Sequence, residues 1–577
     1  MLAGLAAAPA ETLLEAEHGT LTGVAVATAA AGFSGSGYVT GFDAPGDNVA
    51  WTFTAAAGVY RLGIRFRTPF GQKGFSGVLD GNGFSGMFAA TTAFANHDAG
   101  LVELVAGANT LEIGGGWNWY EIDAVTLAPD APVAPLPVPA VPCDPLATPA
   151  ARWLLETVTA GYGTTTLSGQ HELADASHVL AVSGELPAVI EGDLIDYSPS
   201  RVERGGMPPN YTETILATDA DGHLASFCWH WNAPAGLLDT PEQPWWRGFY
   251  TEATTFDVAA ALNDPAGPEY ALLLRDIDAI AVQLGKAAAA GIPLLWRPLH
   301  EAEGGWFWWG ARGPGPFKQL WRLLHERLTN HHGLHNLVWV LTNEHPDWYP
   351  GDDVVDVVGV DGYPDNRSDA LSSRWEALLA RFDGIKPLAL TEFGGVPDVE
   401  RMHRLGVTWA WFCSWNGSAG PASEPDDKVA RVYQSAAVVT LGELPPPPTP
   451  FQAWQKDSFG AAAADPLVAG ESADPDRDGL ANLLEYALDT DPLTPGPAPS
   501  TATLVTAGDG APFLCLTAHR NPLATDVTFT VEVAPDPGGG WNSAETLVLT
   551  DTPALLVVRD TGAGPRRFIR LRVERGG

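Results

Sequence analysis

Residues 270–301 read YALLLRDIDAIAVQLGKAAAAGIPLLWRPLHE, and this stretch decides the fold. Its first part, 270–291, has the pattern of a helix, and the apolar run that follows is typical of a buried strand. Two polar residues, His300 and Glu301, stand at the end of that run. A helix that leads into a buried strand is one repeat of an α/β fold.

The same unit recurs along the middle of the chain, between about residues 145 and 440. Eight apolar runs alternate there with helical stretches, at 164–170, 187–197, 223–231, 292–301, 337–344, 354–363, 386–394 and 407–417. Eight strands that alternate with helices in one domain predict a (β/α)₈ TIM barrel. Each run is followed by His, Glu, Asp, Tyr or Trp, at the end where such a barrel keeps its active site.

Two carboxylates are the chemical core of this prediction. Glu301 ends the fourth strand and Glu392 ends the seventh, so we expect them to face each other across the barrel mouth. A pair of carboxyl groups that flank a sugar bond is the minimum requirement for glycoside hydrolysis. Arg297 and Tyr363 are predicted to keep one carboxylate ionised, and His230 and His300 to donate to the substrate or to the acid.

The motifs WRPLHE, GGWFWW, GVDGYPD, LTEFGG and SGQHE together resemble glycoside hydrolase family 26, whose best-known members are β-1,4-mannanases. The resemblance covers roughly 145–440. It implies that Glu301 is the acid/base and Glu392 the nucleophile of a retaining reaction, with carboxyl groups about 5–5.5 Å apart. It also implies that Trp415 forms the floor of the −1 sugar site. Many members have Asn where this chain has Glu303, which we interpret as a substrate contact or a solvated loop charge.

The aromatic residues near these motifs are either core or sugar platform. Trp306 is predicted to line the +1 side, whereas Trp308 and Trp309 are predicted to be packing. Glu344 imitates the acid of related barrels but lies on the fifth strand, so we exclude it. The residues predicted to bind substrate are His230, Trp231, Arg297, His300, Trp306, Trp348, Tyr363 and Trp415.

Proline-rich stretches at 128–142 and 444–450 divide the chain. The predicted segments are a β-sandwich at 10–128, a linker at 129–143, the hydrolase domain at 144–441, a linker at 442–450, a short helical segment at 451–499 and a β module at 500–577. The chemistry of the last module stays open between a spacer, a surface anchor and a second sugar binder.

Short strands with frequent turn residues predict an antiparallel β-sandwich in the N-terminal piece. The stretches LLEAEHGTL, GFSGSGYV and WNWYEIDAVTL resemble the family 35 carbohydrate-binding modules. The resemblance implies a structural calcium held by Glu15, Glu17 and Asp123. The candidates for sugar contact are Trp117, Asn118 and Trp119, with mannan, galactosyl side groups or uronic acids as ligands.

The segment 474–485, DPDRDGLANLLE, matches the calcium-loop pattern D-x-D-x-D-G-x₅-E in full. Asp474, Asp476, Asp478 and Glu485 are the predicted oxygen ligands of an EF-hand-like site with a structural role. The alternative is a solvated acidic loop.

The composition limits the partners. Sixty-nine Asp and Glu against 32 Lys and Arg give a formal net charge of −37, which argues against nucleic acid and anionic membrane surfaces. A neutral sugar is unaffected by that field, and 21 Trp suit stacking on it. No run of 18 apolar residues spans a membrane, and the four Cys are read as buried thiols. We expect a monomer, secreted or on the cell surface, whose targeting segment lies outside this sequence, because the opening residues lack a basic n-region.

The sequence therefore predicts a retaining endo-β-1,4-mannanase that acts on mannan, glucomannan or galactomannan without a catalytic cofactor. The alternatives are a hydrolase of the same family on mixed-linkage glucan or β-1,3-xylan, an exo-acting mannobiohydrolase, and a non-catalytic polysaccharide-binding protein.

Overall fold

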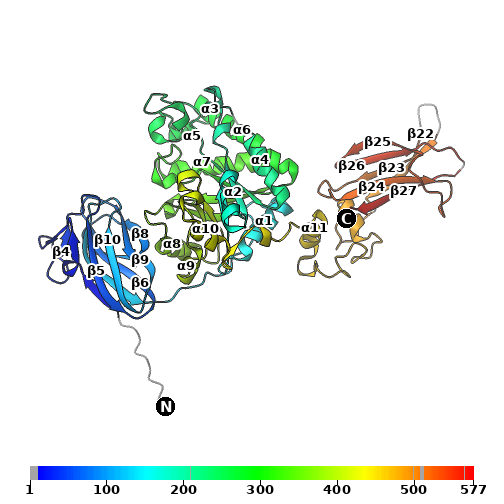
Figure 1. Ribbon diagram of the computed structural model, residues 1–577. Helices are drawn as coiled ribbons and strands as arrows, with labels where there is room; N and C mark the ends of the chain where they lie inside the picture. Colours follow the sequence, from blue (N-terminus) through cyan, green and yellow to red (C-terminus); the bar gives the residue numbers. More distant parts are fainter. Residues whose placement is uncertain (1–10, 208–209, 498, 507–511, 565, 577) are drawn as a thin grey trace, which may run out of the picture. The chain divides into compact units, whose positions relative to one another are not determined.

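The computed structural model describes residues 11–207, 210–497, 499–506, 512–564 and 566–576. The predicted boundaries at residues 10 and 577 lie outside these ranges. The chain divides into two compact units, Met1–Pro445 and Pro446–Gly577 (Figure 1). The division falls inside the second proline-rich stretch.

The first unit begins with the predicted antiparallel β-sandwich. One sheet has the order β3-β4-β11-β6-β9, with β1 paired to β11, and the other has the order β2-β5-β10-β7-β8. The strands are β1 (Thr12–Glu15), β2 (Thr20–Thr22), β3 (Ala25–Ala27), β4 (Tyr38–Thr40), β5 (Asn48–Ala55), β6 (Gly58–Thr68), β7 (Lys73–Leu79), β8 (Asn82–Phe88), β9 (Thr91–Leu104), β10 (Gly107–Gly114) and β11 (Glu121–Pro129). Alternate residues such as Leu62, Ile64 and Phe66 of β6 fill the core between the sheets.

The predicted barrel is present, with eight parallel strands that close in the order β13 to β20. They are β13 (Gly169–His171), β14 (Val189–Asp193), β15 (Leu224–Trp229), β16 (Leu294–Pro298), β17 (Leu337–Thr342), β18 (Val357–Gly362), β19 (Leu388–Phe393) and β20 (Phe412–Ser414). A short pair, β12 (Thr166–Leu167) with β21 (Val438–Val439), lies outside the closed sheet.

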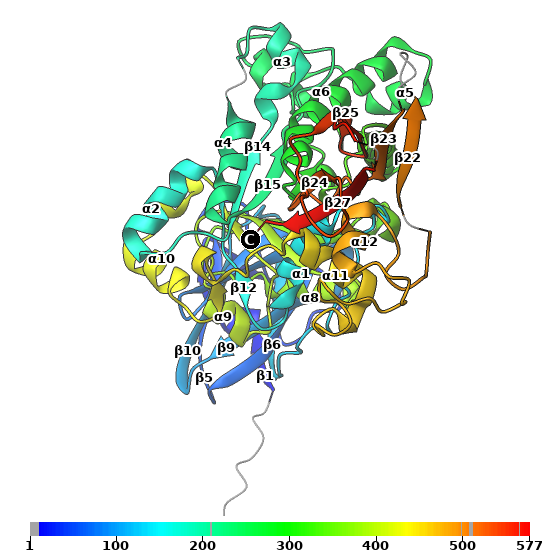
Figure 2. The ribbon, with the colours of Figure 1, turned by 90° about the vertical axis from the view of Figure 1, so that its right-hand side faces the viewer.

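Helices cover the outside of the barrel, as α2, α4 and α6 do beside β14 and β15 (Figure 2). They are α1 (Pro149–Ala160), α2 (Leu173–Ser183), α3 (Pro199–Glu203), α4 (Tyr211–Ala217), α5 (Val258–Asn263), α6 (Pro268–Ala290), α7 (Pro314–Glu326), α8 (Ser372–Phe382), α9 (Val399–Arg404) and α10 (Asp426–Tyr433). The long α6 begins with a proline in its first turn and ends at Gly291 with φ +74°, a left-handed cap that favours glycine.

Ion pairs and hydrogen bonds join the sandwich and the first linker to the barrel. Arg61 of β6 forms a two-bonded ion pair with Glu376 of α8, at 2.8 and 2.9 Å. In the proline-rich segment, the backbone N–H of Leu136 donates to Asp383 at 2.7 Å. The linker therefore packs on the barrel instead of spanning open solvent.

The described residues of the second unit form two α-helices and six strands: α11 (Pro450–Phe459), α12 (Asn482–Leu488), β22 (Ser500–Thr506), β23 (Pro512–His519), β24 (Val527–Ala534), β25 (Thr546–Thr552), β26 (Leu555–Asp560) and β27 (Phe568–Arg575). One sheet has the order β22-β23-β26-β25, and β24 pairs with β27. Ala487 and Leu488 of α12 pack with Leu516, Val531 and Val558 in one small core. The described part of the chain holds no helix that is long and apolar enough to cross a membrane.

Candidate active site

Glu301 lies in a turn that follows β16, not on the strand itself. The strand ends at Pro298, so the predicted strand is three residues too long. Leu299 and Glu301 both have left-handed backbone, with φ of +54° and +55°. This conformation is uncommon outside glycine. The backbone N–H of Glu301 donates to the carbonyl of Thr342 at 3.0 Å, which fixes the turn against β17.

Three carboxylates meet at the mouth of the barrel. Oxygens of Glu301, Asp361 of β18 and Glu392 of β19 all lie within 4.8 Å of one another. The sequence identified the first and the third as a pair. It missed Asp361, although this residue stands in the GVDGYPD motif two positions before Tyr363. Glu301 and Glu392 are thus close enough to act on one sugar bond.

Arg297 is the cation that serves this cluster. Its guanidinium donates to Glu392 at 2.5 Å, to Asp361 at 3.1 Å and to Glu191 at 3.1 Å. Only 1% of the arginine is exposed. Its donors are occupied by carboxylates, so the arginine lies below the cleft, and its contact with substrate stays a prediction. Its second predicted task, to support an ionised carboxylate, fits this geometry.

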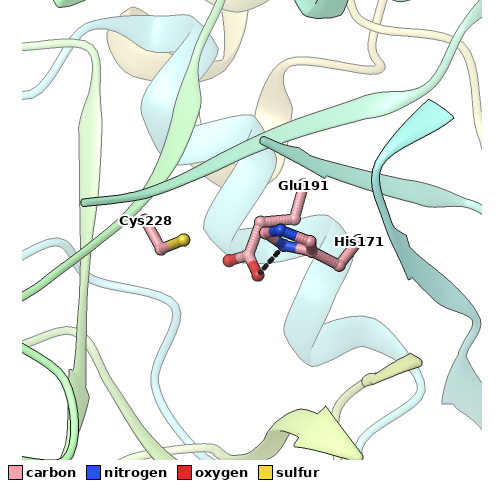
Figure 3. A group of neighbouring side chains, drawn as sticks. All are labelled: His171, Glu191 and Cys228. Atoms are coloured by element: carbon pink, nitrogen blue, oxygen red, sulfur yellow. Dashed lines mark hydrogen bonds and ion pairs between the residues drawn. The ribbon is translucent and has the colours of Figure 1, made fainter. Parts of the chain in front are cut away.

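Glu191, which the sequence analysis missed, continues the network below the cleft. Figure 3 shows its carboxylate beside His171, with Nδ1 of the imidazole 3.2 Å from Oε2, and beside Cys228. Although burial opposes it, the charge of Arg297 lowers the pKa of Glu191 to about 2. Burial raises the pKa of the Cys228 thiol well above its usual value. A neutral thiol beside a carboxylate already paired with arginine makes a poor metal site.

Glu301 and Glu392 differ in their donors. Burial and the Asp361 carboxylate raise the pKa of Glu301 to about 7, and the same two causes raise the pKa of Glu392. Glu392 accepts from Arg297 and, at 2.6 Å, from the hydroxyl of Tyr363. Glu301 accepts from Nε1 of Trp306 at 3.0 Å. Because the charged donor serves Glu392, a proton shared by the pair is more stable on Glu301.

A second buried network lies on the acid's side of the site. Nδ1 of His230 lies 2.7 Å from Asp193, and its Nε2 lies 3.1 Å from Nε2 of His300. Burial lowers the pKa of His300 well below its usual value, so this ring is neutral. His300 is buried, and its contact with substrate stays a prediction. His230 is partly exposed, so it can reach the cleft.

The aromatic residues separate into cleft and core. Trp306 and Tyr363 are each 48% exposed. Trp415 is half-buried and stacks on His171 at 4.0 Å between ring centres. The structure buries two of the predicted substrate contacts, since Trp231 is 0% exposed and Trp348 is 8% exposed. Both belong to the hydrophobic core of the barrel, as do Trp308 and Trp309.

Glu303 and Glu344 make contacts that hold the loop after β17. The carboxylate of Glu303 accepts from the backbone N–H groups of Glu344 at 2.9 Å and His345 at 2.6 Å. Glu344 itself is paired with Arg374. Glu303 therefore fixes the loop after β17, and the interpretation as a solvated loop charge is wrong.

On the sandwich, Trp117 and Trp119 are 63% and 51% exposed. The ring of Trp119 also lies edge-on to the exposed Phe70, at 6.2 Å between centres. Asn118 and Trp119 have left-handed backbone, with φ of +56° and +60°. This strained turn holds apolar rings in solvent, which is unusual unless something stacks on them.

The predicted calcium ligands of the sandwich converge on one loop. The hydroxyl of Ser34 donates to Glu15 at 2.7 Å, and its backbone N–H donates to Asp123 at 3.0 Å. The carboxylate of Glu17 packs against the same loop, since a Cβ at Gly35 would collide with it. Asp123 is also paired with Arg65 at 2.6 Å. The set fits a cation only in part, because an arginine already neutralises one member.

The acidic loop of the second unit fits a cation better. One oxygen from each of Asp474, Asp476 and Asp478 lies within 4.8 Å of the others. Glu485 of α12 is 0% exposed, and within the described chain neither of its carboxylate oxygens has a hydrogen-bond partner. Burial, together with the three aspartates, raises the pKa of Glu485 to about 7. Buried oxygens of Asp474, Asp476 and Glu485 have no hydrogen-bond partner within the described chain. With Asp478 they occupy the first, third, fifth and twelfth positions, which supply the donors that calcium takes.

Comparison with known families matches two parts of the chain. Residues 143–443 match glycosyl hydrolase family 26, and residues 12–130 match carbohydrate binding module family 35.

Similar proteins cover both parts together. A mannan endo-1,4-β-mannosidase of Thermothelomyces thermophilus is 44% identical over 448 residues, which is 77% of this chain and 91% of the relative. Mannan endo-1,4-β-mannosidase A of a Piromyces species is 32% identical over 75% of this chain and 72% of its own length. The crystal structure of a Podospora anserina GH26-CBM35 β-(1,4)-mannanase, 44% identical, covers 75% of this chain and 98% of that chain with a TM-score of 0.56.

Proposed function

Because the chain belongs to glycosyl hydrolase family 26, we propose that it is an endo-1,4-β-mannanase acting on mannan, glucomannan or galactomannan. The observation that carries the proposal is the carboxylate pair. Glu301 and Glu392 have oxygens within 4.8 Å of each other at the barrel mouth and have different donors.

In the proposed reaction, Glu392 attacks the anomeric carbon while protonated Glu301 gives its proton to the leaving oxygen. The glycosyl-enzyme is then hydrolysed by a water that Glu301 deprotonates, and the anomeric configuration is retained. Tyr363 and Arg297 hold Glu392 in its charged form for the attack. A raised pKa lets Glu301 carry its proton near neutral pH.

Trp415 and Trp306 supply the proposed sugar platforms on either side of the scissile bond. Trp415 stacks on His171 and lies near Tyr363, at 6.5 Å between ring centres. Trp306 is bonded to the acid itself through its indole N–H. Each presents an apolar face, on which the flat face of a pyranose packs. His230, the partly exposed member of its network, is proposed to bind a substrate hydroxyl.

The test is release of reducing sugar from mannan. The unmodified chain is expected to release it, and the Glu392→Ala variant is not. Proton NMR of early products from mannohexaose checks retention and the endo mode. A panel of mannan, lichenan and β-1,3-xylan separates the other glycans of the family. Mannobiose as the dominant early product, cut from one chain end, contradicts the endo assignment.

For the sandwich we propose glycan binding through Trp117, Asn118 and Trp119. The support is the exposed aromatic turn and the match to carbohydrate binding module family 35. Substitution of either tryptophan by alanine is expected to reduce retention of the full chain on insoluble mannan. Since the substrate is a polymer too large to enter a cell, we also propose that the protein acts outside the cell, as a monomer.

Two structural calcium sites complete the proposal. Asp474, Asp476, Asp478 and Glu485 would hold one ion, and its charge would balance the buried carboxylates there. Glu15, Glu17 and Asp123 would hold a second, weaker one, because Arg65 competes for Asp123. Isothermal titration of calcium into the metal-free chain, compared with Glu485→Gln and Glu17→Gln, tests the two sites separately.

A further inference from the structure

We propose that the sandwich and the barrel form one composite glycan-binding groove, in which the outer face of β7, β8 and β10 and the barrel loop 364–369 bind the same neutral β-glycan chain that the active site cleaves. The inference rests on the proposed function. It extends that function by placing a sugar-binding site between the two domains of the first unit.

The groove is a cleft of about 280 Å³ with one wall from each domain. The sandwich supplies Ser76, Val78 and Glu112, and the barrel supplies Asp365 and Asn366. Strand pairing brings the sandwich residues side by side, since Val78 of β7 lies opposite Glu112 of β10. The cleft is therefore a property of the two domains in contact and is absent from either one alone.

Direct hydrogen bonds hold the barrel loop on the sandwich. The backbone N–H of Gly83 donates to the hydroxyl of Ser368 at 2.9 Å. The hydroxyl of Ser85 donates to the buried carboxylate of Asp369 at 2.6 Å. These bonds fix the second wall at a defined position, so the cleft is preorganised for a ligand.

The barrel wall of the groove is next to the catalytic centre along the chain. Pro364 lines the cleft, and the residue before it is Tyr363, whose hydroxyl donates to Glu392. Tyr363 is half exposed. A glycan that leaves the cleft along this loop therefore meets the rim of the active site.

One end of the groove leads toward the aromatic turn of the sandwich. Gly74, Ser76 and Val78 share one face of β7. The backbone N–H of Trp117 donates to the carbonyl of Gly74 at 2.9 Å, and a Cβ at Gly74 would lie 3.4 Å from its indole ring. From Gly74 to Val78 the strand advances about 13 Å. Position 83, opposite Val78 in the ladder, is against the barrel, since a Cβ there would lie 2.7 Å from that of Asn366.

The lining suits a neutral sugar chain. Carboxylate, amide and hydroxyl groups accept and donate to sugar hydroxyls, while Val78 offers apolar contact to a sugar face. Glycine and serine along the floor leave room for a flat ligand to approach the backbone. Acidic residues on both walls, in a chain of net charge −37, exclude a polyanion.

The experiment measures how affinity depends on chain length. The full-length Glu392→Ala variant is titrated by calorimetry with mannotriose and with mannooligosaccharides of increasing length. We expect affinity to keep rising with length, and the ratio of long-chain to mannotriose affinity to fall at least about threefold when Glu112→Arg or Asp365→Arg blocks one wall. Thr52→Arg, an exposed position on neighbouring β5 outside the cleft, is the matched control and is expected to keep the ratio.

A fall in the ratio of long-chain to mannotriose affinity in both wall variants, with an unchanged ratio in Thr52→Arg, supports the groove. An unchanged ratio in either wall variant, or an equal loss in Thr52→Arg, overturns it. Mannan hydrolysis by the unmodified chain is measured in parallel. If that hydrolysis is present while the ratio is insensitive to both walls, the groove fails and the proposed function stands. If hydrolysis is absent, the proposed function fails whatever the titration gives.

Discussion

Two clusters of buried carboxylates, one at the barrel mouth and one in the acidic loop of the second unit, solve the same electrostatic problem in opposite ways. At the barrel mouth, one guanidinium, that of Arg297, donates to Glu191, Asp361 and Glu392. In the loop, Glu485 is equally buried, yet within the described chain neither of its oxygens has a donor.

This difference indicates the chemical role of each cluster. A buried charge is tolerated only when it is paired or neutralised. The barrel carries its own cation and distributes one proton between two carboxylates, which is what acid/base chemistry needs. In the loop, Arg477 is exposed, and no described cation donates to Glu485, which is what a metal site needs.

The largest effect is expected on activity when the barrel cluster loses its nucleophile. Glu392→Ala should reduce kcat on mannan at least about a thousandfold, because the variant lacks the carboxylate that forms the covalent intermediate. Steady-state kinetics measure the loss. Azide added to the variant as an external nucleophile should restore some turnover, and failure of the variant to lose activity would remove Glu392 from the mechanism.

Removal of the internal cation should make the barrel cluster resemble the loop. Arg297→Met leaves three buried carboxylates without their counter-ion, so we expect a loss of about 3–5 kcal/mol in the free energy of unfolding. Urea denaturation measures it. Arg275→Met is the matched control, because Arg275 pairs with Asp276 and Glu203 at a partly exposed position. Equal losses in the two variants would show that the burial of Arg297 has no special role.

The loop should respond to calcium where the barrel does not. With free calcium at 100 times its dissociation constant, the second unit should gain about 2.7 kcal/mol of stability. Differential scanning calorimetry of the full chain, with calcium and with a chelator, measures the shift. Glu485→Gln should abolish the calcium response of the second unit, whereas Glu532→Gln, in a partly exposed ion pair with Arg570, should retain it.

The smallest effect concerns the proton on Glu301. Since the pKa of this acid is raised to about 7, the protonated form is lost as the pH rises through 7, and kcat/KM should fall there. The indole N–H of Trp306 stabilises the ionised form. Trp306→Phe should therefore raise this pKa further and move the alkaline limb to higher pH by a fraction of a unit. A shift in the other direction would contradict the assignment.

Sequence patterns predicted the barrel and the sandwich because each depends on periodicity that neighbouring residues reveal. They also predicted the pair Glu301 and Glu392, because both stand directly after apolar runs. They did not predict Glu191, whose role depends on Arg297, 106 positions away in the chain. Only the closed sheet brings the two together.

The sequence also did not predict which aromatic side chains are exposed. Trp231 follows β15 as Trp415 follows β20, and Trp348 lies in a short helix after β17, yet Trp231 and Trp348 are both buried. Trp231 is held in place by a hydrogen bond from its indole to Asp276 on α6. Which aromatic residue faces the cleft depends on contacts with helices far away in the chain, and periodicity does not encode them.

The first proline-rich segment has a consequence for the engineering of this chain. Segment 129–143 is bonded to the barrel at Asp383, and a Cβ at Gly406 would lie 2.7 Å from that of Pro132. The segment is thus fitted to the surface of this barrel and cannot be exchanged for another linker. A chimera with a foreign binding module should keep residues 129–443 together as one segment. The surface of α8 must also be redesigned, because the grafted module would otherwise lack contacts with the barrel.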